Sequence, residues 1–208
     1  MQTRIKICGI TSLEDAQFAI KTGADALGFV FYPPSPRHID LNTAVTITRQ
    51  LPPFITTTAL FVNAEQNLIN QVINRARIDC IQFHGDESPK ACNLYHRPWI
   101  KAIRMKPEID LIQLNQDYQQ ASALLLDSYV KGIPGGTGAQ FNWSKIPPVL
   151  CPHIILAGGL TPLNISQAVE QVQPWAVDVS GGVEKQKGIK DHDKICQFIQ
   201  AVRACNYE

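Results

Sequence analysis

The chain has 208 residues, of which 45% are hydrophobic and 18% charged, and its formal net charge at pH 7 is +1. This length can bury one sizeable core, so we expect a single domain over residues 1–208. The near-zero charge does not favour nucleic acid or an anionic membrane as a partner, and no apolar run approaches the roughly 18–20 residues that a membrane span needs.

Eight apolar runs of strand length follow one another along the chain. They are RIKIC (4–8), ALGFVF (26–31), TTALFV (57–62), CIQFH (80–84), WIKAI (99–103), ALLLD (123–127), HIILAG (153–158) and AVDVSG (176–181). Because these runs are almost continuously apolar, they are predicted to be strands buried on both faces of a sheet.

Segments with helical spacing separate most of these runs. The clearest are SLEDAQFAIKTGA (12–24), AEQNLINQVINRAR (64–77), TPLNISQAVEQV (161–172) and DHDKICQFIQAVRAC (191–205). Ser12 has the chemistry of an N-cap and acids follow it in the first turn, while Pro162 is expected at the first position of its helix. Strands that alternate with helices predict parallel βα units. An open doubly wound sheet is the alternative, but eight units in 208 residues fit a compact (β/α)8 TIM barrel better.

In such a barrel the active site forms at the carboxyl ends of the strands and in the loops that follow them. Polar side chains gather at these ends. They are Cys8, Arg37, His38, Asn63, His84, Arg104 and Asp127, followed by the segment DVSGGVE after the last strand. This concentration of titratable groups at one rim of the barrel indicates an enzyme.

Two Gly-Gly pairs follow the last two strands, Gly158–Gly159 and Gly181–Gly182. Glycine lets a backbone approach a ligand closely, and exposed N–H groups bind phosphate well. In this fold a phosphate commonly lies between the seventh and eighth loops, so the four glycines are predicted to bind phosphate, with tight turning alone as the alternative.

One long glycine-rich segment, SYVKGIPGGTGAQF (128–141), follows the sixth strand. A loop of this length usually has a functional reason to exist. We expect it to be mobile around Gly135, Gly136, Thr137 and Gly138 and to close over the site; a flexible surface connection is the alternative.

Seven short motifs, taken together, resemble those of a known enzyme family. KICGIT, GFVFYPPSPRHI, LFVN, IQFHGDES, LLLDS…GGTG, LAGGL and DVSGGVE cover nearly the whole chain. In this order they resemble the phosphoribosylanthranilate isomerase family of tryptophan biosynthesis. The resemblance implies a (β/α)8 barrel that uses no metal and no organic cofactor.

The resemblance also implies a reaction, the Amadori rearrangement of N-(5-phosphoribosyl)anthranilate to 1-(2-carboxyphenylamino)-1-deoxyribulose 5-phosphate. An acid protonates the furanose ring oxygen so that the ring opens to an iminium, and a base then removes the proton from C2. By similarity Asp127 is the acid and Cys8 the base. Asp127 follows a buried run, which favours a protonated carboxyl. A thiol of ordinary pKa ~8.5 needs a modest downward shift, which a cation at the barrel mouth would supply.

Three further residues receive substrate-binding roles. Arg37 matches the family's loop arginine and is expected to hold the anthranilate carboxylate through its planar guanidinium; an exposed salt bridge is the alternative. His84 either lines the sugar site or is structural. Asp178 contacts sugar hydroxyls, orders the eighth loop or is purely structural.

The chain departs from the family's pattern in two places. Family members usually read D-V-S-S-G-V-E where this chain has Gly181, and G-T-G-[KR]-x-F-D-W where it has Ala139 and Asn142. Neither departure touches the predicted acid or base.

The expected partner is a small phosphorylated aminosugar that carries anthranilate, and both a monomer and a homodimer stay open. The N-terminal MQTRIKIC lacks the long apolar core of a signal peptide. The six cysteines contain no C-x-x-C and are expected to be free thiols in a reducing compartment, so we expect a cytoplasmic enzyme.

Three other functions compete with this interpretation. A histidine-pathway aminoaldose isomerase would be expected to have an aspartate in place of Cys8. A non-catalytic barrel that binds a phosphorylated metabolite would need the glycine pairs but not the paired acid and base. The lack of C-x-x-C disfavours a thiol-redox protein.

Overall fold

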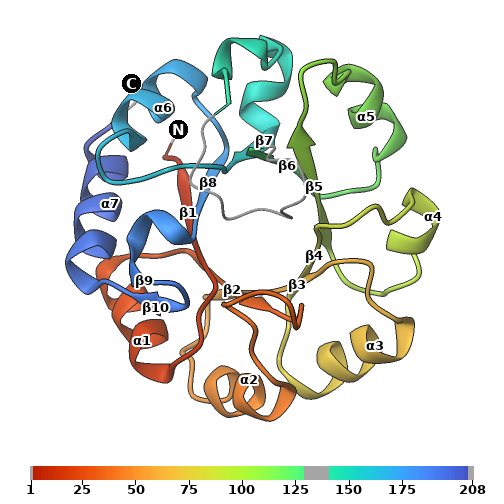
Figure 1. The fold of residues 1–208 in the computed structure, drawn as a ribbon, viewed down its shortest axis with the longest axis vertical. Coiled ribbons are helices and arrows are strands. Elements are labelled where there is room, and N and C mark those ends of the chain that lie inside the picture. Colours follow the sequence, from red (N-terminus) through yellow and green to blue (C-terminus); the bar gives the residue numbers. More distant parts are fainter. Residues whose placement is uncertain (1, 129–140, 206–208) are drawn as a thin grey trace.

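The computed structural model describes residues 2–128 and 141–205. Within them, eight parallel strands close into a barrel in chain order, with the helices as an outer ring (Figure 1). The strands are β1 (Arg4–Cys8), β2 (Ala26–Val30), β3 (Thr56–Phe61), β4 (Cys80–Phe83), β5 (Trp99–Met105), β6 (Ala123–Ser128), β7 (Ile154–Leu156) and β8 (Ala176–Val179). The predicted (β/α)8 barrel is confirmed.

Helices follow most of the strands, as the sequence predicts. They are α1 (Leu13–Thr22), α2 (Leu41–Thr48), α3 (Gln66–Arg75), α4 (Pro89–Cys92), α5 (Leu111–Asp117), α6 (Ile165–Val172) and α7 (His192–Ala204), with the 3-10 turns η1 (Trp143–Lys145), η2 (Pro148–His153) and η3 (Gly181–Val183). The predicted cap of α1 is present: Ser12 accepts a hydrogen bond from the N–H of Asp15. In the part of the chain that the structure covers, none of these helices is long and apolar enough to cross a membrane.

The structure differs from the sequence prediction around β7. This strand begins at Ile154 because η2 runs through His153. The following helix begins at Ile165, so the prediction that Pro162 opens it was wrong. The side chain of Asn164 accepts a hydrogen bond from the N–H of Thr161 at 2.8 Å and holds the intervening residues in a turn.

A two-stranded antiparallel hairpin, β9 (Glu184–Gln186) and β10 (Ile189–Lys190), follows η3. The sequence analysis did not predict it. Glu184 and Lys190 face each other in its register, and both side chains are buried. The hairpin therefore places two charged groups inside the protein next to the last strand of the barrel.

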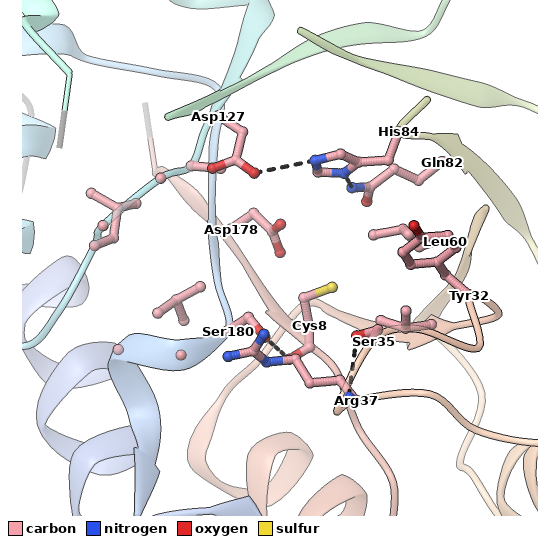
Figure 2. A pocket seen from close by; sticks show the side chains of 18 of the residues that line it. Cys8, Tyr32, Ser35, Arg37, Leu60, Gln82, His84, Asp127, Asp178 and Ser180 are labelled. Atoms are coloured by element: carbon pink, nitrogen blue, oxygen red, sulfur yellow. Dashed lines mark hydrogen bonds and ion pairs between the residues drawn. The ribbon is translucent and has the colours of Figure 1, made fainter. Parts of the chain in front are cut away.

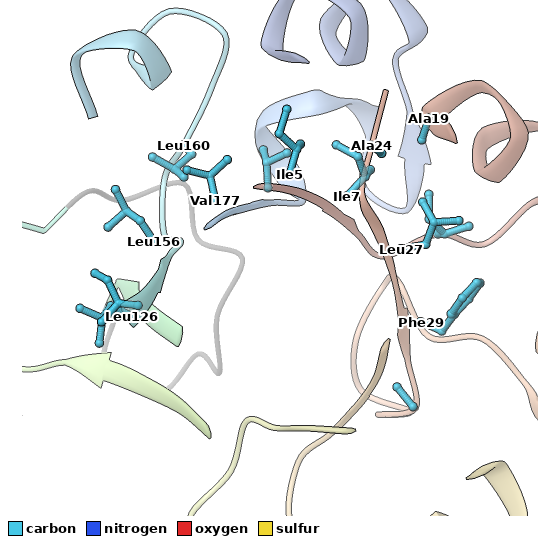
Figure 3. Packing of buried hydrophobic residues seen from close by; sticks show 14 of the residues in the cluster. Ile5, Ile7, Ala19, Ala24, Leu27, Phe29, Leu126, Leu156, Leu160 and Val177 are labelled. Atoms are coloured by element: carbon cyan, nitrogen blue, oxygen red, sulfur yellow. The ribbon is translucent and has the colours of Figure 1, made fainter. Parts of the chain in front are cut away.

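Alternation along the strands separates core residues from site residues. Ile5, Ile7 and Leu27 lie on the outer side of β1 and β2, toward the helices (Figure 3), and are completely buried. Lys6 and Cys8 alternate with the two isoleucines and therefore point into the barrel. Below the site, the interior is filled by an apolar cluster of Cys80, Ile100, Ala102, Leu125, Ile155, Ala157 and Ala176.

Candidate active site

A pocket of about 500 Å³ opens at the carboxyl ends of the barrel strands. It brings together the described residues that were predicted to act in catalysis or binding, whereas His38, Asn63 and Arg104 do not line it. The predicted residues that line it are Cys8, Arg37, His84, Asp127, Gly158, Gly159, Asp178, Gly181 and Gly182. The Cys8 thiol and the Asp127 and Asp178 carboxyl groups point into this pocket (Figure 2). β1 and β6, which carry the thiol and Asp127, are separated in the ring by β7 and β8.

The Cys8 thiol ends β1 in a space that Gly28 leaves open. The two residues are paired in the register of β1 and β2. A Cβ atom at position 28 would lie 2.8 Å from the Cys8 Sγ and 2.9 Å from the Lys6 Nζ. Val30 and Leu60 pack against Cys8 and give the thiol an apolar wall.

Lys6 is a residue of the site that the sequence analysis missed. The register of β1 and β8 pairs Lys6 with Asp178, and its Nζ lies 2.9 Å from the Asp178 Oδ1. Both side chains are buried, so the ion pair is shielded from water. The available signal was the spacing K-x-C, because residues two apart on a strand point to the same face.

Burial raises the pKa of the Cys8 thiol, and the Lys6 ammonium opposes this effect. Burial would lower the pKa of Lys6, but Asp178 and Cys8 outweigh it, so the pKa of Lys6 is raised. The expected cation near the thiol is therefore present as Lys6. The expected net downward shift of the pKa of Cys8 is not found, because desolvation is the larger effect and raises it.

Asp127 belongs to a chain of buried polar side chains. Its Oδ1 accepts the N–H of Ser128 at 2.8 Å, and its Oδ2 lies 3.2 Å from the His84 Nε2. The other ring nitrogen of His84 lies 3.0 Å from the Gln82 Nε2. If that amide nitrogen donates, the His84 Nε2 carries the ring proton and points it at Asp127. His84 can therefore hold Asp127 in place and stabilise a negative charge on its carboxyl group.

Arg37 enters the pocket from the loop after β2 and meets Glu184 of the β9–β10 hairpin. Its Nε and Nη2 donate to the two Glu184 oxygens at 2.7 and 2.8 Å. An exposed salt bridge is the alternative to ligand binding for Arg37, but the ion pair with Glu184 is mostly buried and lies at the edge of the pocket.

The two glycine pairs lie next to each other across the seventh and eighth loops. Gly158 and Gly159 have φ angles of 78° and 65°, a conformation that side chains disfavour. A Cβ atom at Gly182 would meet the backbone oxygen of Leu160, so the two loops are in direct contact. Their backbone can therefore approach a ligand closely, which is what a phosphate site needs.

Four predicted loop residues, Gly135, Gly136, Thr137 and Gly138, lie outside the described residues, as does Ala139. Asn142 is described and caps η1, with its Oδ1 accepting the N–H of Ser144 at 3.0 Å. An amide oxygen thus serves here as the capping acceptor at the position where the family usually has an acid.

Over residues 2–128 and 141–205, no group of three or more His, Cys, Asp or Glu side chains is placed to hold a metal ion. That the reaction needs no metal or organic cofactor stays a prediction.

Comparison with known proteins identifies the family. A family model described as N-(5'phosphoribosyl)anthranilate (PRA) isomerase matches residues 5–201. The chain belongs to the N-(5'-phosphoribosyl)anthranilate isomerase family. The family protein of Thiobacillus denitrificans is 53% identical over 204 residues, which are 98% of this chain and 100% of that protein. The one from Pseudomonas fluorescens is 56% identical over 200 residues, 96% of this chain and 95% of that protein.

Solved structures of phosphoribosylanthranilate isomerases agree with this match. The one from Thermotoga maritima superimposes with a TM-score of 0.90 at 40% identity, over 98% of this chain and 100% of that chain. A complex with reduced 1-(o-carboxyphenylamino)-1-deoxyribulose 5-phosphate superimposes with a TM-score of 0.86 at 39% identity, with the same coverage. The predicted family, fold and activity, an isomerase of tryptophan biosynthesis, are confirmed.

Proposed function

We propose that the pocket converts N-(5-phosphoribosyl)anthranilate to 1-(2-carboxyphenylamino)-1-deoxyribulose 5-phosphate, with Asp127 as the general acid and Cys8 as the general base. The observation that carries this assignment is that a buried carboxyl group and a buried thiol, from β6 and β1, point into one pocket that glycine-rich loops border. The reduced product bound in a solved relative carries a ring carboxylate and a phosphate, which supports a pocket with one group for each of these anions, Arg37 for the carboxylate and the glycine pairs for the phosphate.

Asp127 starts the reaction by giving its proton to the furanose ring oxygen, which opens the ring to an iminium. The departing proton leaves a carboxylate, and the N–H of Ser128 and the His84 ring are placed to stabilise it. Hydrogen bonds that strengthen as charge develops lower the barrier more than they tighten substrate binding.

Cys8 then removes the proton from C2 as a thiolate, and the resulting enolamine tautomerises to the ketone. A charged Lys6 next to the thiol stabilises the thiolate form, while the Asp178 carboxylate holds Lys6 in place. The acid and the base thus reach the sugar from different strands of the ring, β6 and β1.

Backbone N–H groups of Gly158, Gly159, Gly181 and Gly182 are proposed to bind the phosphate, and Arg37 the anthranilate carboxylate. We further propose that the chain acts as one domain, as a monomer or a homodimer; one solved relative is described as a monomeric form of a dimeric isomerase. The six cysteines are free thiols, which supports a reducing compartment, the cytoplasm.

The proposed function is tested by adding the purified protein to freshly generated N-(5-phosphoribosyl)anthranilate and following the loss of its fluorescence. We expect saturable conversion and a ketose product that chromatography can identify. Absence of turnover with a folded preparation would overturn the proposed function.

Arg37→Ala is expected to raise KM by about tenfold or more while kcat changes little, because the contact with the ring carboxylate lies away from the reacting carbons. The measurement is a saturation curve with the fluorescent substrate. An unaltered KM would show that the guanidinium serves the Glu184 ion pair alone.

Lys6→Met is expected to move the acidic limb of the kcat/KM pH profile to higher pH. The groups that influence the Cys8 thiol are Lys6 on β1, Asp178 on β8 and Lys190 on β10. Lys6 lowers the pKa of the thiol and Asp178 raises it, so removing the ammonium leaves less thiolate at a given pH. Lys101→Met is the control, since Lys101 is another buried lysine of the barrel but pairs with Glu87. An acidic limb that stays in place in Lys6→Met would exclude this role.

A further inference from the structure

Glu184 and Lys190 form a buried charged cluster with Arg37 at the edge of the pocket. Glu184 accepts hydrogen bonds from the Nε and Nη2 of Arg37, and the Lys190 Nζ lies 3.0 Å from the Glu184 Oε1. Lys190 also donates to the carbonyl of Ser180 at 3.2 Å. The exposed fraction is 0% for the Lys190 side chain, 4% for Glu184 and 12% for Arg37. Of these three residues, only Arg37 lines the pocket.

The charges of this cluster matter for an anionic ligand. Arg37 and Glu184 alone form a neutral pair, and the Glu184 carboxylate would repel a ligand carboxylate held by the same guanidinium. Burial lowers the pKa of Lys190, and the nearby Glu184 carboxylate opposes this effect. As an ammonium 3.0 Å from the Glu184 Oε1, Lys190 neutralises that carboxylate and leaves the cluster with one net positive charge. In a buried setting such charges are weakly screened, so this third residue decides whether a carboxylate is attracted.

The geometry also fixes which atoms of Arg37 face a ligand. The edge formed by Nε and Nη2 is turned to Glu184, and among the described residues Nη1 has no hydrogen-bond partner. A Cβ atom at Gly9 would lie 2.8 Å from the Arg37 Cδ, and one at Gly181 would lie 3.0 Å from its Nη2. The side chain therefore lies close against both glycines, and its two hydrogen bonds to Glu184 fix the orientation of the guanidinium.

We propose that Glu184 and Lys190 are positioning residues for substrate specificity: Glu184 orients Arg37, and Lys190 supplies the net charge that makes the site prefer an aryl group with a carboxylate. This inference rests on the proposed function of the pocket. It goes further in assigning the preference for a carboxylated ring to two buried residues that need not touch the substrate.

The test compares two stable competitors of the isomerisation, the reduced ketose products derived from anthranilate and from aniline, which differ only in the ring carboxylate. Their inhibition constants do not depend on the fraction of folded enzyme. Lys190→Met is expected to raise the inhibition constant of the carboxylated competitor about tenfold to a hundredfold. The inhibition constant of the aniline compound is expected to change by less than about twofold. Lys185→Met is the matched control, because Lys185 is an exposed lysine of the same hairpin.

A second variant separates charge from structural damage. Adding Glu184→Gln to Lys190→Met returns the cluster to one net positive charge, so the double variant is expected to recover part of the preference for the carboxylated competitor. The inference would be overturned if Lys190→Met raised both inhibition constants by the same factor, or if the preference for the carboxylated competitor stayed as in the wild type. Those outcomes leave the proposed function intact, whereas a wild-type protein without isomerase activity would overturn the function itself.

Discussion

Cys8→Ala is expected to lower kcat by about 10²–10⁴-fold, the usual contribution of general acid–base catalysis, while the barrel stays folded. Alanine keeps the small apolar contact with Val30 and Leu60 but cannot accept the C2 proton. The measurements are kcat from the loss of substrate fluorescence and the thermal unfolding temperature of the same preparation.

Cys80→Ala provides the matched control for this variant. Cys80 is a second buried thiol of the barrel, but it lies in the apolar cluster beneath the site, and burial raises its pKa to about 11. We expect Cys80→Ala to keep near wild-type kcat. A Cys8→Ala protein that turned over as fast as this control would rule out Cys8 as the base.

Asp127→Asn is expected to lower kcat by a similar factor, about 10²–10⁴-fold, with substrate affinity largely kept. An amide has nearly the shape of the carboxyl group, and its single oxygen can keep one of the two contacts, with His84 or with the N–H of Ser128, but it has no acidic proton for the ring oxygen. The checks are kcat and the inhibition constant of the reduced product analogue. A retained kcat would exclude Asp127 as the acid, and loss of inhibitor binding would show that the substitution damaged the pocket instead.

The positions of the catalytic candidates could be predicted from the sequence because strand ends and strand faces follow simple rules. Cys8 and Asp127 each stand at the end of an apolar run, and in a parallel barrel such ends meet at one rim. His84 and Asp178 follow from the same rule. The glycine pairs at 158–159 and 181–182 could also be placed, since loops after neighbouring strands lie side by side.

The partners of these residues could not be predicted in the same way. Arg37 and Glu184 are 147 positions apart, and nothing local in either segment indicates that they meet. Lys190 lies in a polar segment that reads as a surface loop, yet the hairpin buries it completely. The helix start at Pro162 was mispredicted because the hydrogen bond from Thr161 to Asn164 is not encoded in simple capping rules.

The charge state of the thiol shows a further limit. A cation near the strand end is expected to lower the pKa of Cys8, and Lys6 does act in that direction. The depth at which the barrel holds the sulfur was not predictable, and burial outweighs the effect of the ammonium on the pKa of the thiol. The balance between burial, which raises the pKa of a thiol, and a nearby positive charge, which lowers it, depends on the three-dimensional surroundings of the sulfur and not on residue type alone.

The measurement that tests the central assignment most directly compares wild-type protein with the double variant Cys8→Ala/Asp127→Asn on freshly generated N-(5-phosphoribosyl)anthranilate at equal protein concentration. We expect rapid loss of substrate fluorescence and formation of the ketose product with the wild type, and no decay above the uncatalysed rate with the double variant. Decay at the wild-type rate by the folded double variant would contradict the assignment.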